Sequence, residues 1–200
     1  MPEGKTVEMT TGIVTIEGEA TDDQLVAAAQ HALPAFEHLY RRYVNDVYRF
    51  CLRRLDSETD AADATSAVFT RALSSIKSCQ AHSFRPWLFT IARNVVTDHY
   101  RAAKQTHALD ESLEIADRAS GPEELAIQGD ERRSLAAVLG RLTDEQRSII
   151  ELRLAGLSAN EIASALGKSR NAIDQMQFRA VARLRTLLAS PVLQMEETPG

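Results

Sequence analysis

Residues 142–173 read LTDEQRSIIELRLAGLSANEIASALGKSRNAI, and this stretch decides the fold of the C-terminal part of the chain. It holds two capping boxes. In a capping box, the hydroxyl of the residue before the helix accepts a hydrogen bond from the backbone amide three residues later, and the Gln or Glu side chain at that later position accepts one from the amide of the first residue. The two boxes are Thr143 with Gln146 and Ser158 with Glu161. The spacing therefore predicts that a helix begins at each box.

Glycines mark where both of these helices end. Gly156 follows an alanine and Gly167 follows a leucine, each at a position where a left-handed residue closes a helix. A longer helix is predicted from Arg170 to about Leu188. Small apolar side chains around the two turns predict a helix-turn-helix, a motif whose last helix enters the major groove of DNA. These side chains are Leu157, Ile162, Ala163, Leu166, Ala172 and Ile173.

The N-terminal half has the apolar periodicity of four further helices. Pro34 divides a periodic run over residues 21–55 into two helices, because proline lacks the amide that a helix interior needs. Two more helices are expected over residues 60–74 and 86–104, the second with Pro86 in its first turn. Aromatic residues are only 6%, and runs of Val, Ile and Thr are sparse. The predicted fold class is all-α, with a four-helix N-terminal domain and a helix-turn-helix C-terminal domain joined by an acidic linker.

Charge divides the 200-residue chain into blocks around a net charge of −5. Residues 21–104 hold 11 Lys and Arg against nine Asp and Glu, and residues 132–190 hold ten against five. Residues 105–131 between them hold one Arg and eight acids. Two basic helical blocks joined by an acidic stretch predict two modules that face nucleic acid. Two solvated surfaces with an ordinary linker would give the same pattern.

The predicted domain division follows these blocks. It comprises a flexible acidic extension (1–20), an N-terminal domain (21–104), an acidic linker (105–121), a C-terminal domain (122–190) and a tail (191–200). The extension contains TGIVTIEG, but a lone strand has no pairing partner in a helical protein. The sequence leaves open whether the two domains pack together, and packing would cover their basic faces and reduce DNA binding.

The predicted helix over residues 86–104 has one apolar and one polar side. Leu88, Ile91, Ala92 and Val95 share the apolar side. The polar side carries Thr90, Asn94, Thr97, Asp98, Arg101 and Lys104. Hydrogen-bonding residues beside cations can hold a phosphate backbone and also contact base edges. Many surface helices share this pattern, so periodicity alone leaves both interpretations open.

Several other classes of protein are disfavoured. The chain has no phosphate loop, nucleophile elbow or metal-ligand set, so we expect neither an enzyme nor a cofactor. Cys51 and Cys79 form no CxxC pair, and Cys79 with His82 gives only half of a zinc knuckle, so no metal site is expected. The chain has neither a signal peptide nor an uncharged apolar stretch near the roughly 20 residues of a membrane helix, which predicts a cytoplasmic protein without membrane insertion.

Four stretches together resemble the extracytoplasmic-function (ECF, group 4) sigma factors, the smallest members of the sigma-seventy class of bacterial RNA polymerase specificity subunits. WLFTIARN (87–94), followed by Asp98 and Arg101, is a distinctive match, and its combination with the C-terminal module is very specific. The stretches are DDQLVAAAQHALPAFEHLYRRYVNDVYRF (22–50), DAADATSAVF (60–69), PWLFTIARNVVTDHYR (86–101) and the opening stretch (142–173).

The resemblance implies a function for each domain. The N-terminal domain is expected to bind core RNA polymerase through Asp60, Asp63, Ser66 and Ala67. It is expected to melt the minus-ten promoter element through Arg85, Arg93, Asn94, Asp98 and Arg101, with the loop 79–85 helping to hold a flipped base. The helix-turn-helix is expected to bind the minus-thirty-five element through Ser169, Arg170, Asn171, Asp174, Gln175 and Arg179. The linker is expected to run toward the RNA exit path, and an anti-sigma factor is expected as a further partner.

Two departures from the family pattern bear on affinity. Ser66 and Ala67 stand where relatives carry Gln and Glu on the polymerase-contacting helix, and a lost polar contact costs about 1–3 kcal/mol. Asp174 and Met176 stand where Lys and Arg are common in the recognition helix. We therefore expect an unusual minus-thirty-five sequence or a greater dependence on the polymerase for binding.

The alternative hypothesis is a stand-alone helix-turn-helix regulator that binds duplex DNA. It explains the C-terminal module but leaves the WLFTIARN block (87–94) and the acidic linker without a purpose. Such a regulator would bind duplex DNA tightly without any polymerase.

The salt dependence of minus-thirty-five binding tests the departure in the recognition helix. Each phosphate contact adds about 0.9 to the slope of log affinity against log salt concentration. With Asp174 and Met176 in place of two cations, we expect a shallow slope in a salt titration of duplex binding. The steep slope of a fully basic recognition helix would contradict this prediction.

Overall fold

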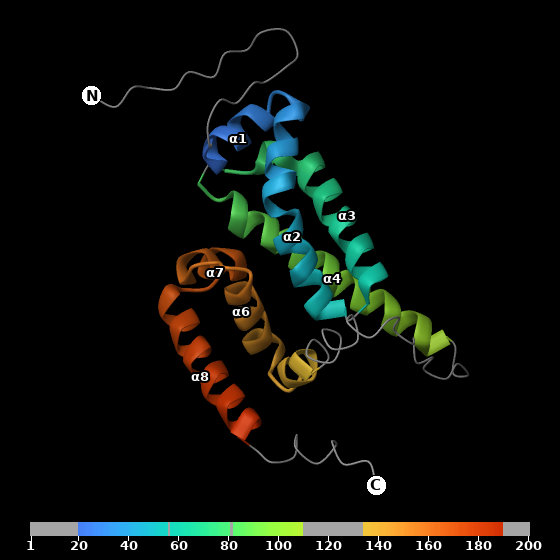
Figure 1. Cartoon of the computed structure of the whole chain (residues 1–200), viewed down its shortest axis with the longest axis vertical. Coiled ribbons are helices and arrows are strands. Elements are labelled where there is room, and N and C mark those ends of the chain that lie inside the picture. The colour runs from blue at the N-terminus through green and yellow to red at the C-terminus, as the bar shows by residue number, and fades with distance from the viewer. Residues whose placement is uncertain (1–19, 56, 81, 110–133, 190–200) are drawn as a thin grey trace, which may run out of the picture.

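A computed structural model describes residues 20–55, 57–80, 82–109 and 134–189, and its elements are all helices over these residues. The helices form two groups that lie against each other (Figure 1). The first group contains α1 (Asp22–Ala29), α2 (Phe36–Leu55), α3 (Glu58–Ser75) and α4 (Phe84–Leu109). The second contains α6 (Asp144–Leu154), α7 (Ala159–Leu166) and α8 (Arg170–Ala189), preceded by a helical stretch over residues 134–140. The predicted all-α class with two helical domains is confirmed.

The N-terminal group begins as the sequence predicts. Thr21 caps α1 through a capping box with Gln24, and Pro34 lies in the short 3-10 turn η1 (Leu33–Ala35) that separates α1 from α2. Helices α2, α3 and α4 then pack around aromatic side chains. The rings of Phe50 and Phe89 meet edge to face, with their centroids 5.6 Å apart. Both side chains are fully buried, and each contributes about 1.5–3 kcal/mol through burial.

Helix bounds differ from the predictions by a few residues. Ser57 caps α3 by accepting from the amide of Asp60, so this helix begins two residues earlier than expected. Helix α4 continues to Leu109, five residues into the predicted linker. Residues 110–121 of that linker, the extension 1–19 and the tail 191–200 lie outside the described residues. No helix in the described part is long and apolar enough to cross a membrane.

The C-terminal group is a helix-turn-helix, and its local signals are those predicted. Both capping boxes form, at Thr143 for α6 and at Ser158 for α7. Gly167 closes α7 in the left-handed region, with φ 60°, and Gly156 makes the preceding turn, with φ 82°. The wedge between the helices is fully buried and includes Ile149, Leu152, Leu157, Ile162 and Ile173.

The two domains pack against each other, chiefly through α4 on α7 and α2 on α6. A single cluster of buried apolar side chains extends across both, from Leu25 in α1 to Ile173 in α8. Thr90 of α4 also donates its hydroxyl to the carbonyl of Ala165 in α7, at 3.2 Å. The described residues therefore settle the question of packing in favour of one closed body.

A buried ion pair lies at the contact between the domains. Glu151 of α6 is 0% exposed, and its carboxylate lies against the guanidinium of Arg54 in α2. Arg147, one turn earlier in α6, donates from Nε to the other carboxylate oxygen at 2.7 Å. Burial raises the pKa of Glu151, while Arg54 and Arg147 oppose that shift. Cations from both domains therefore offset part of the cost of one buried charge.

Further polar contacts fix these two arginines in place. Arg54 donates from Nη2 to the hydroxyl of Ser148 at 2.7 Å. Arg147 donates from Nη2 to the backbone carbonyl of Arg53, also at 2.7 Å. Each guanidinium thus bonds to the opposite domain, which makes the contact specific rather than merely attractive.

Both cysteines are free thiols in the core of the N-terminal domain. Burial raises the pKa of Cys51 to about 11, against smaller opposing effects, and raises that of Cys79 to about 11. The thiolate is the reactive form, so neither side chain has the environment of a redox sensor. In the described part of the chain, no group of three His, Cys, Asp or Glu side chains could hold a metal ion.

Thiol labelling at varied pH tests this assignment. At about pH 8 a thiol of pKa about 11 is ionised in about one molecule in a thousand, so iodoacetamide should label the native protein very slowly. Labelling should rise about tenfold for each pH unit toward 11, and both cysteines should react rapidly in guanidinium chloride. Fast labelling of the native protein near neutral pH would contradict the buried placement.

Substitution of Arg54 tests the ion pair between the domains. Arg54→Met leaves the Glu151 charge with one partner, at a cost of about 3–5 kcal/mol while it stays buried. Opening of the domains relieves this cost, so we expect a larger radius of gyration by X-ray scattering with unchanged helix content.

The matched control is Arg41→Met on the same helix. Arg41 pairs with Glu37 at 2.6 Å, but its side chain is 74% exposed, and such pairs contribute only about 0–1 kcal/mol. This variant should keep the radius of gyration of the parent protein. An unchanged radius for Arg54→Met would show that the ion pair does not hold the domains together.

Candidate nucleic-acid interface

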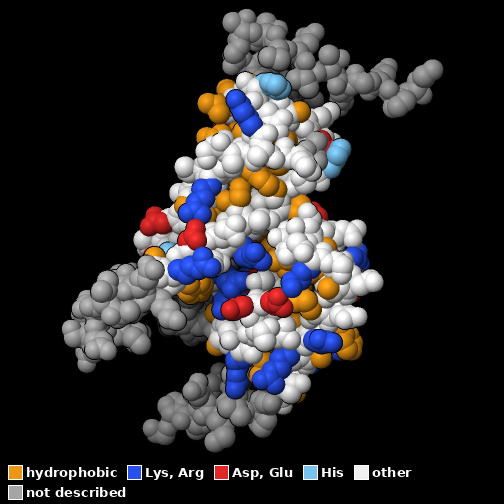
Figure 2. Space-filling model, turned by 180° about the vertical axis from the view of Figure 1, so that it is seen from behind, with side chains coloured by type: hydrophobic (Ala, Val, Ile, Leu, Met, Phe, Trp, Pro, Cys, Tyr) orange, Lys and Arg blue, Asp and Glu red, His pale blue; other side chains and the backbone are white. Residues whose placement is uncertain are grey.

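A cleft of about 880 Å³ lies between the two domains. Figure 2 shows Lys and Arg side chains gathered about the middle of one face of the molecule, with acidic side chains among them. The basic side chains that line the cleft are Arg54, Arg71, Arg93, Arg101, Arg147 and Lys168. The acidic ones are Asp98, Asp144 and Glu145. One wall of the cleft is therefore a cationic surface on α4, and the facing wall, at the start of α6, is partly acidic.

Most of the predicted minus-ten residues meet in this cleft. Arg93, Asn94, Asp98 and Arg101 all line it, because their spacing along α4 places them on one side of the helix. Arg93 is half-buried and the other three are exposed. Asp98 accepts from Nη1 of Arg71 in α3 at 2.9 Å, so it is paired within its own domain. The cleft thus brings one amide and two cations with no partner in the described residues onto one side of α4.

Arg85 is the predicted minus-ten residue that lies outside the cleft. Its Nη2 donates to the carbonyl of Ala155, in the turn between α6 and α7, at 2.7 Å. A Cβ atom on Gly156 would lie 2.6 Å from that same nitrogen. Glycine at this position therefore permits both the left-handed turn and the approach of Arg85. In this arrangement Arg85 contacts the C-terminal domain.

The loop before α4 is held in place by α1. Gln30 donates from Nε2 to the carbonyls of Cys79 and Ile76, at 2.8 and 3.3 Å. Asp23 accepts from the amide of His82 at 2.5 Å and also pairs with its imidazole. His82 has φ 64°, a region that few residues other than glycine adopt. Helix α1 thus fixes the shape of the loop that the family resemblance assigns to a flipped base.

The predicted minus-thirty-five residues lie together at the start of α8. Ser169, Arg170, Asn171, Asp174, Gln175 and Arg179 are all exposed. Ser169 caps this end of the helix, since its hydroxyl accepts from the amide of Ala172 at 3.3 Å. Because the N-terminal domain packs on α7 and α6, the outer side of α8 stays open to a ligand.

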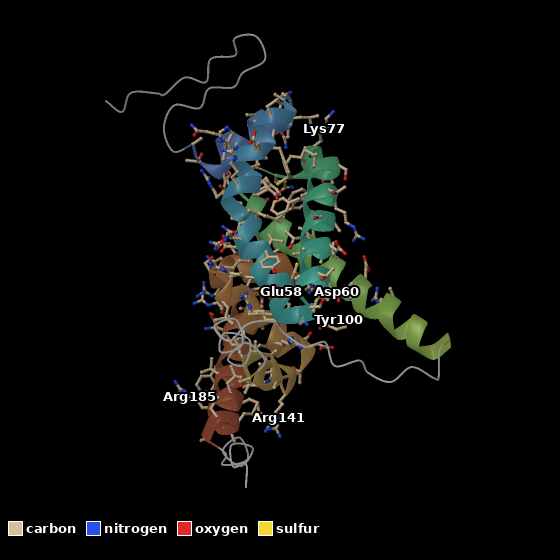
Figure 3. All side chains as sticks on the ribbon, turned by 45° about the vertical axis from the view of Figure 1, so that its right-hand side comes forward. Glu58, Asp60, Lys77, Tyr100, Arg141 and Arg185 are labelled. Carbon is tan, nitrogen blue, oxygen red and sulfur yellow. The ribbon has the colours of Figure 1, made fainter. Side chains whose placement is uncertain are left out.

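The predicted polymerase contacts lie along α3. Asp63 and Ser66 are exposed, whereas Asp60 and Ala67 are half-buried. Asp60 lies 3.8 Å from the imidazole of His99 in α4. Figure 3 shows Asp60 close to Glu58 and Tyr100, where the start of α3 meets α4, and Lys77 beyond the far end of α3. The exposed members, Asp63 and Ser66, lie about one turn apart in the first half of α3, and neither lines the cleft.

Sequence reasoning missed the residues that join the two domains. Arg54, Arg147 and Glu151 carry no motif, and their pairing depends on tertiary structure. One signal was available, because Glu151 shares the buried side of α6 with Ser148 and Leu152. An acid on an apolar side of a helix requires a compensating cation nearby.

Comparison with known proteins finds similarity in both domains. A family model of sigma-70 region 2 matches residues 39–106, and one of sigma-70 region 4 matches residues 132–184. The ECF RNA polymerase sigma factor BldN of Streptomyces coelicolor is 36% identical over 171 residues, which is 82% of this chain. The matched part is 65% of BldN, so the chain spans just under two thirds of that relative. The ECF RNA polymerase sigma factor SigX of Bacillus subtilis is 30% identical over 158 residues, 75% of this chain and 81% of SigX.

Solved structures give the same picture of the fold. CnrH in complex with the cytosolic domain of CnrY has a TM-score of 0.67 at 27% identity, and the match covers 84% of this chain and 96% of that one. The sigma factor RpoE in complex with the anti-sigma factor NepR, from Bartonella quintana, has a TM-score of 0.62 at 23% identity. That match covers 76% of this chain and 96% of RpoE, and it bears on the fold alone.

Proposed function

This chain belongs to the extracytoplasmic-function family of RNA polymerase sigma factors, and we propose that it binds core RNA polymerase and directs promoter recognition, promoter melting and transcription initiation. The observation that carries the proposal is the presence of both sigma regions in one chain, with all the predicted minus-ten residues except Arg85 in one cleft and the predicted minus-thirty-five residues exposed at α8. In this proposal the chain supplies recognition in the cytoplasm, and the polymerase supplies catalysis.

The N-terminal domain acts on the minus-ten element through α4. Asn94 offers an amide for base edges, and Arg93 and Arg101 offer cations for phosphates on the same side of the helix. Melting requires unstacking, which costs a few kcal/mol per base. Capture of the extruded bases offsets that cost, so melting needs no nucleotide hydrolysis by the sigma factor.

The C-terminal domain acts on the minus-thirty-five element through α8. The predicted contacts lie in the first half of this helix, and they are exposed in the closed body. A helix of this kind fits the major groove, where each base pair presents a distinct pattern of donors and acceptors.

Binding both elements at once requires the domains to move apart. The elements lie about 25 base pairs apart by their names, or about 85 Å of duplex at about 3.4 Å per base pair. The described structure instead holds α4 against α7. Residues 110–133 can span about 80 Å when extended, and the two domains add their own widths to that reach, so the chain is long enough for separation. We therefore assign the described structure to a closed form that precedes promoter binding.

An anti-sigma factor is the further partner in this proposal. Members of the family are commonly held inactive by such a protein, which covers both domains. The stand-alone regulator remains the competing function, but it leaves the region 2 match over residues 39–106 without a role.

Run-off transcription distinguishes these two functions. Core bacterial RNA polymerase is incubated with fragments of the source genome, with and without the protein, and new start sites are mapped. New starts that share two spaced elements are expected from a sigma factor. Tight duplex binding by the protein alone, without new starts, would favour the stand-alone regulator.

Asn94→Ala tests the minus-ten assignment on any promoter found in this way. Loss of one base contact costs about 1–3 kcal/mol, so we expect transcript yield to fall about tenfold. Asn45→Ala is the matched control, because Asn45 is an exposed asparagine on α2 outside the cleft. Transcription by Asn94→Ala at the level of this control would rule out a minus-ten contact by Asn94.

A further inference from the structure

Arg170 at the start of α8 is held by two partners from different helices. Its Nε donates to both carboxylate oxygens of Asp174, one turn later, at 3.0 and 2.9 Å. Its Nη1 donates to the side-chain carbonyl of Asn160 in α7 at 2.9 Å. Arg170 and Asp174 are each about half exposed, so the guanidinium lies at the surface with a fixed orientation.

The bonding leaves a defined edge of this guanidinium open. An arginine side chain has N–H donors on Nε, Nη1 and Nη2. The two partners take the donor on Nε and one on Nη1, and Nη2 donates to none of the described residues. Donors on Nη1 and Nη2 therefore remain for a ligand. Fixing the side chain in advance also reduces the rotamer entropy lost on binding.

The carboxylate of Asp174 decides which ligand fits this edge. A phosphate would meet the negative charge of Asp174 close to Arg170, which weakens the pair as a backbone anchor. A base edge carries no net charge and gains from donors fixed in direction. Guanine presents two neighbouring acceptors, O6 and N7, in the major groove, and a pair of arginine donors matches them.

We propose that Arg170 contacts a guanine in the minus-thirty-five element and that Asp174 and Asn160 are positioning residues that set its guanidinium for this contact. The inference rests on the proposed entry of α8 into the major groove. It gives Asp174 a role in place of the phosphate contact that a lysine there would make. Compared with a lysine at this position, Asp174 increases specificity at one base pair and lowers the affinity that comes from phosphate contacts.

A binding selection from randomised duplex DNA tests this inference. The full chain is used, with and without core polymerase, so the result does not depend on transcription. The parent protein should enrich a guanine at one position, and 7-deazaguanine there, which lacks N7, should weaken binding about tenfold. Arg170→Lys and Asp174→Ala should each reduce the preference at that position several-fold and leave other positions unchanged. Asn160→Ala should weaken the same preference.

A matched control uses the other exposed pair of this type. Glu37→Ala removes the partner of Arg41 at the same spacing on α2, and it should leave base preference unaltered. The inference is overturned if no guanine is enriched in either condition, or if Asp174→Ala leaves the preference intact. It is also overturned if Asp174→Ala strengthens binding to all sequences equally and steepens the salt slope by about 0.9, which is the behaviour of a freed phosphate anchor.

These outcomes differ from failure of the proposed function. Run-off transcription could give no new starts while the selection shows a guanine preference that is lost in Asp174→Ala. In that case the sigma assignment fails and the contact by Arg170 stands. If new starts appear and Asp174→Ala leaves the guanine preference intact, the sigma assignment stands and the inference fails.

Discussion

The buried carboxylate of Glu151 lies between two arginines, one from each domain, at the contact that closes the molecule. Full burial of a carboxylate costs several kcal/mol, and Arg147 alone compensates it from only one side. Arg54, which belongs to the other domain, adds a second cation, although burial still outweighs the two arginines and keeps the pKa of Glu151 raised. The position of the helix-turn-helix on the N-terminal domain therefore depends on this charge, in addition to the apolar contacts between α4 and α7.

A contact of this type is well suited to a reversible closure. When the domains open, Glu151 loses Arg54 but keeps Arg147 and becomes hydrated. Hydration recovers the desolvation cost of the carboxylate while the attraction to Arg54 is lost. For buried ion pairs the desolvation cost and the electrostatic attraction are similar in size, so the ion pair contributes only a small net free energy to closure. Arg85 behaves in the same way, because its bond to the Ala155 carbonyl can be exchanged for bonds to water or phosphate. Closure can thus be specific in geometry without being strong.

The parts of this structure that sequence predicts are those decided within a few residues of the chain. Capping boxes at Thr143 and Ser158 and the left-handed Gly167 involve near neighbours, so their spacing suffices. The grouping of Arg93 with Arg101 also follows from one helix and its period. The rest joins distant segments, as in Arg54 with Glu151 or Gln30 with Cys79, and nothing local specifies it. Arg170 is intermediate, since Asp174 is one turn away but Asn160 lies on another helix.

The cleft connects closure to DNA binding through charge. Asp144 and Glu145 of α6 line the same cleft as Arg93 and Arg101, so carboxylates are brought toward the surface that the minus-ten strand would use. Glu145 pairs with Lys168 at 2.9 Å, and among the described residues neither acid pairs with Arg93 or Arg101. The two acids therefore act on this surface by charge at a distance, and they would repel phosphates there until α6 moves away. Opening of the domains removes this repulsion without breaking an ion pair on α4, so closure weakens DNA binding at this surface through charge alone. Additional contacts, such as those proposed for core polymerase on α3, can then decide between the closed and open forms.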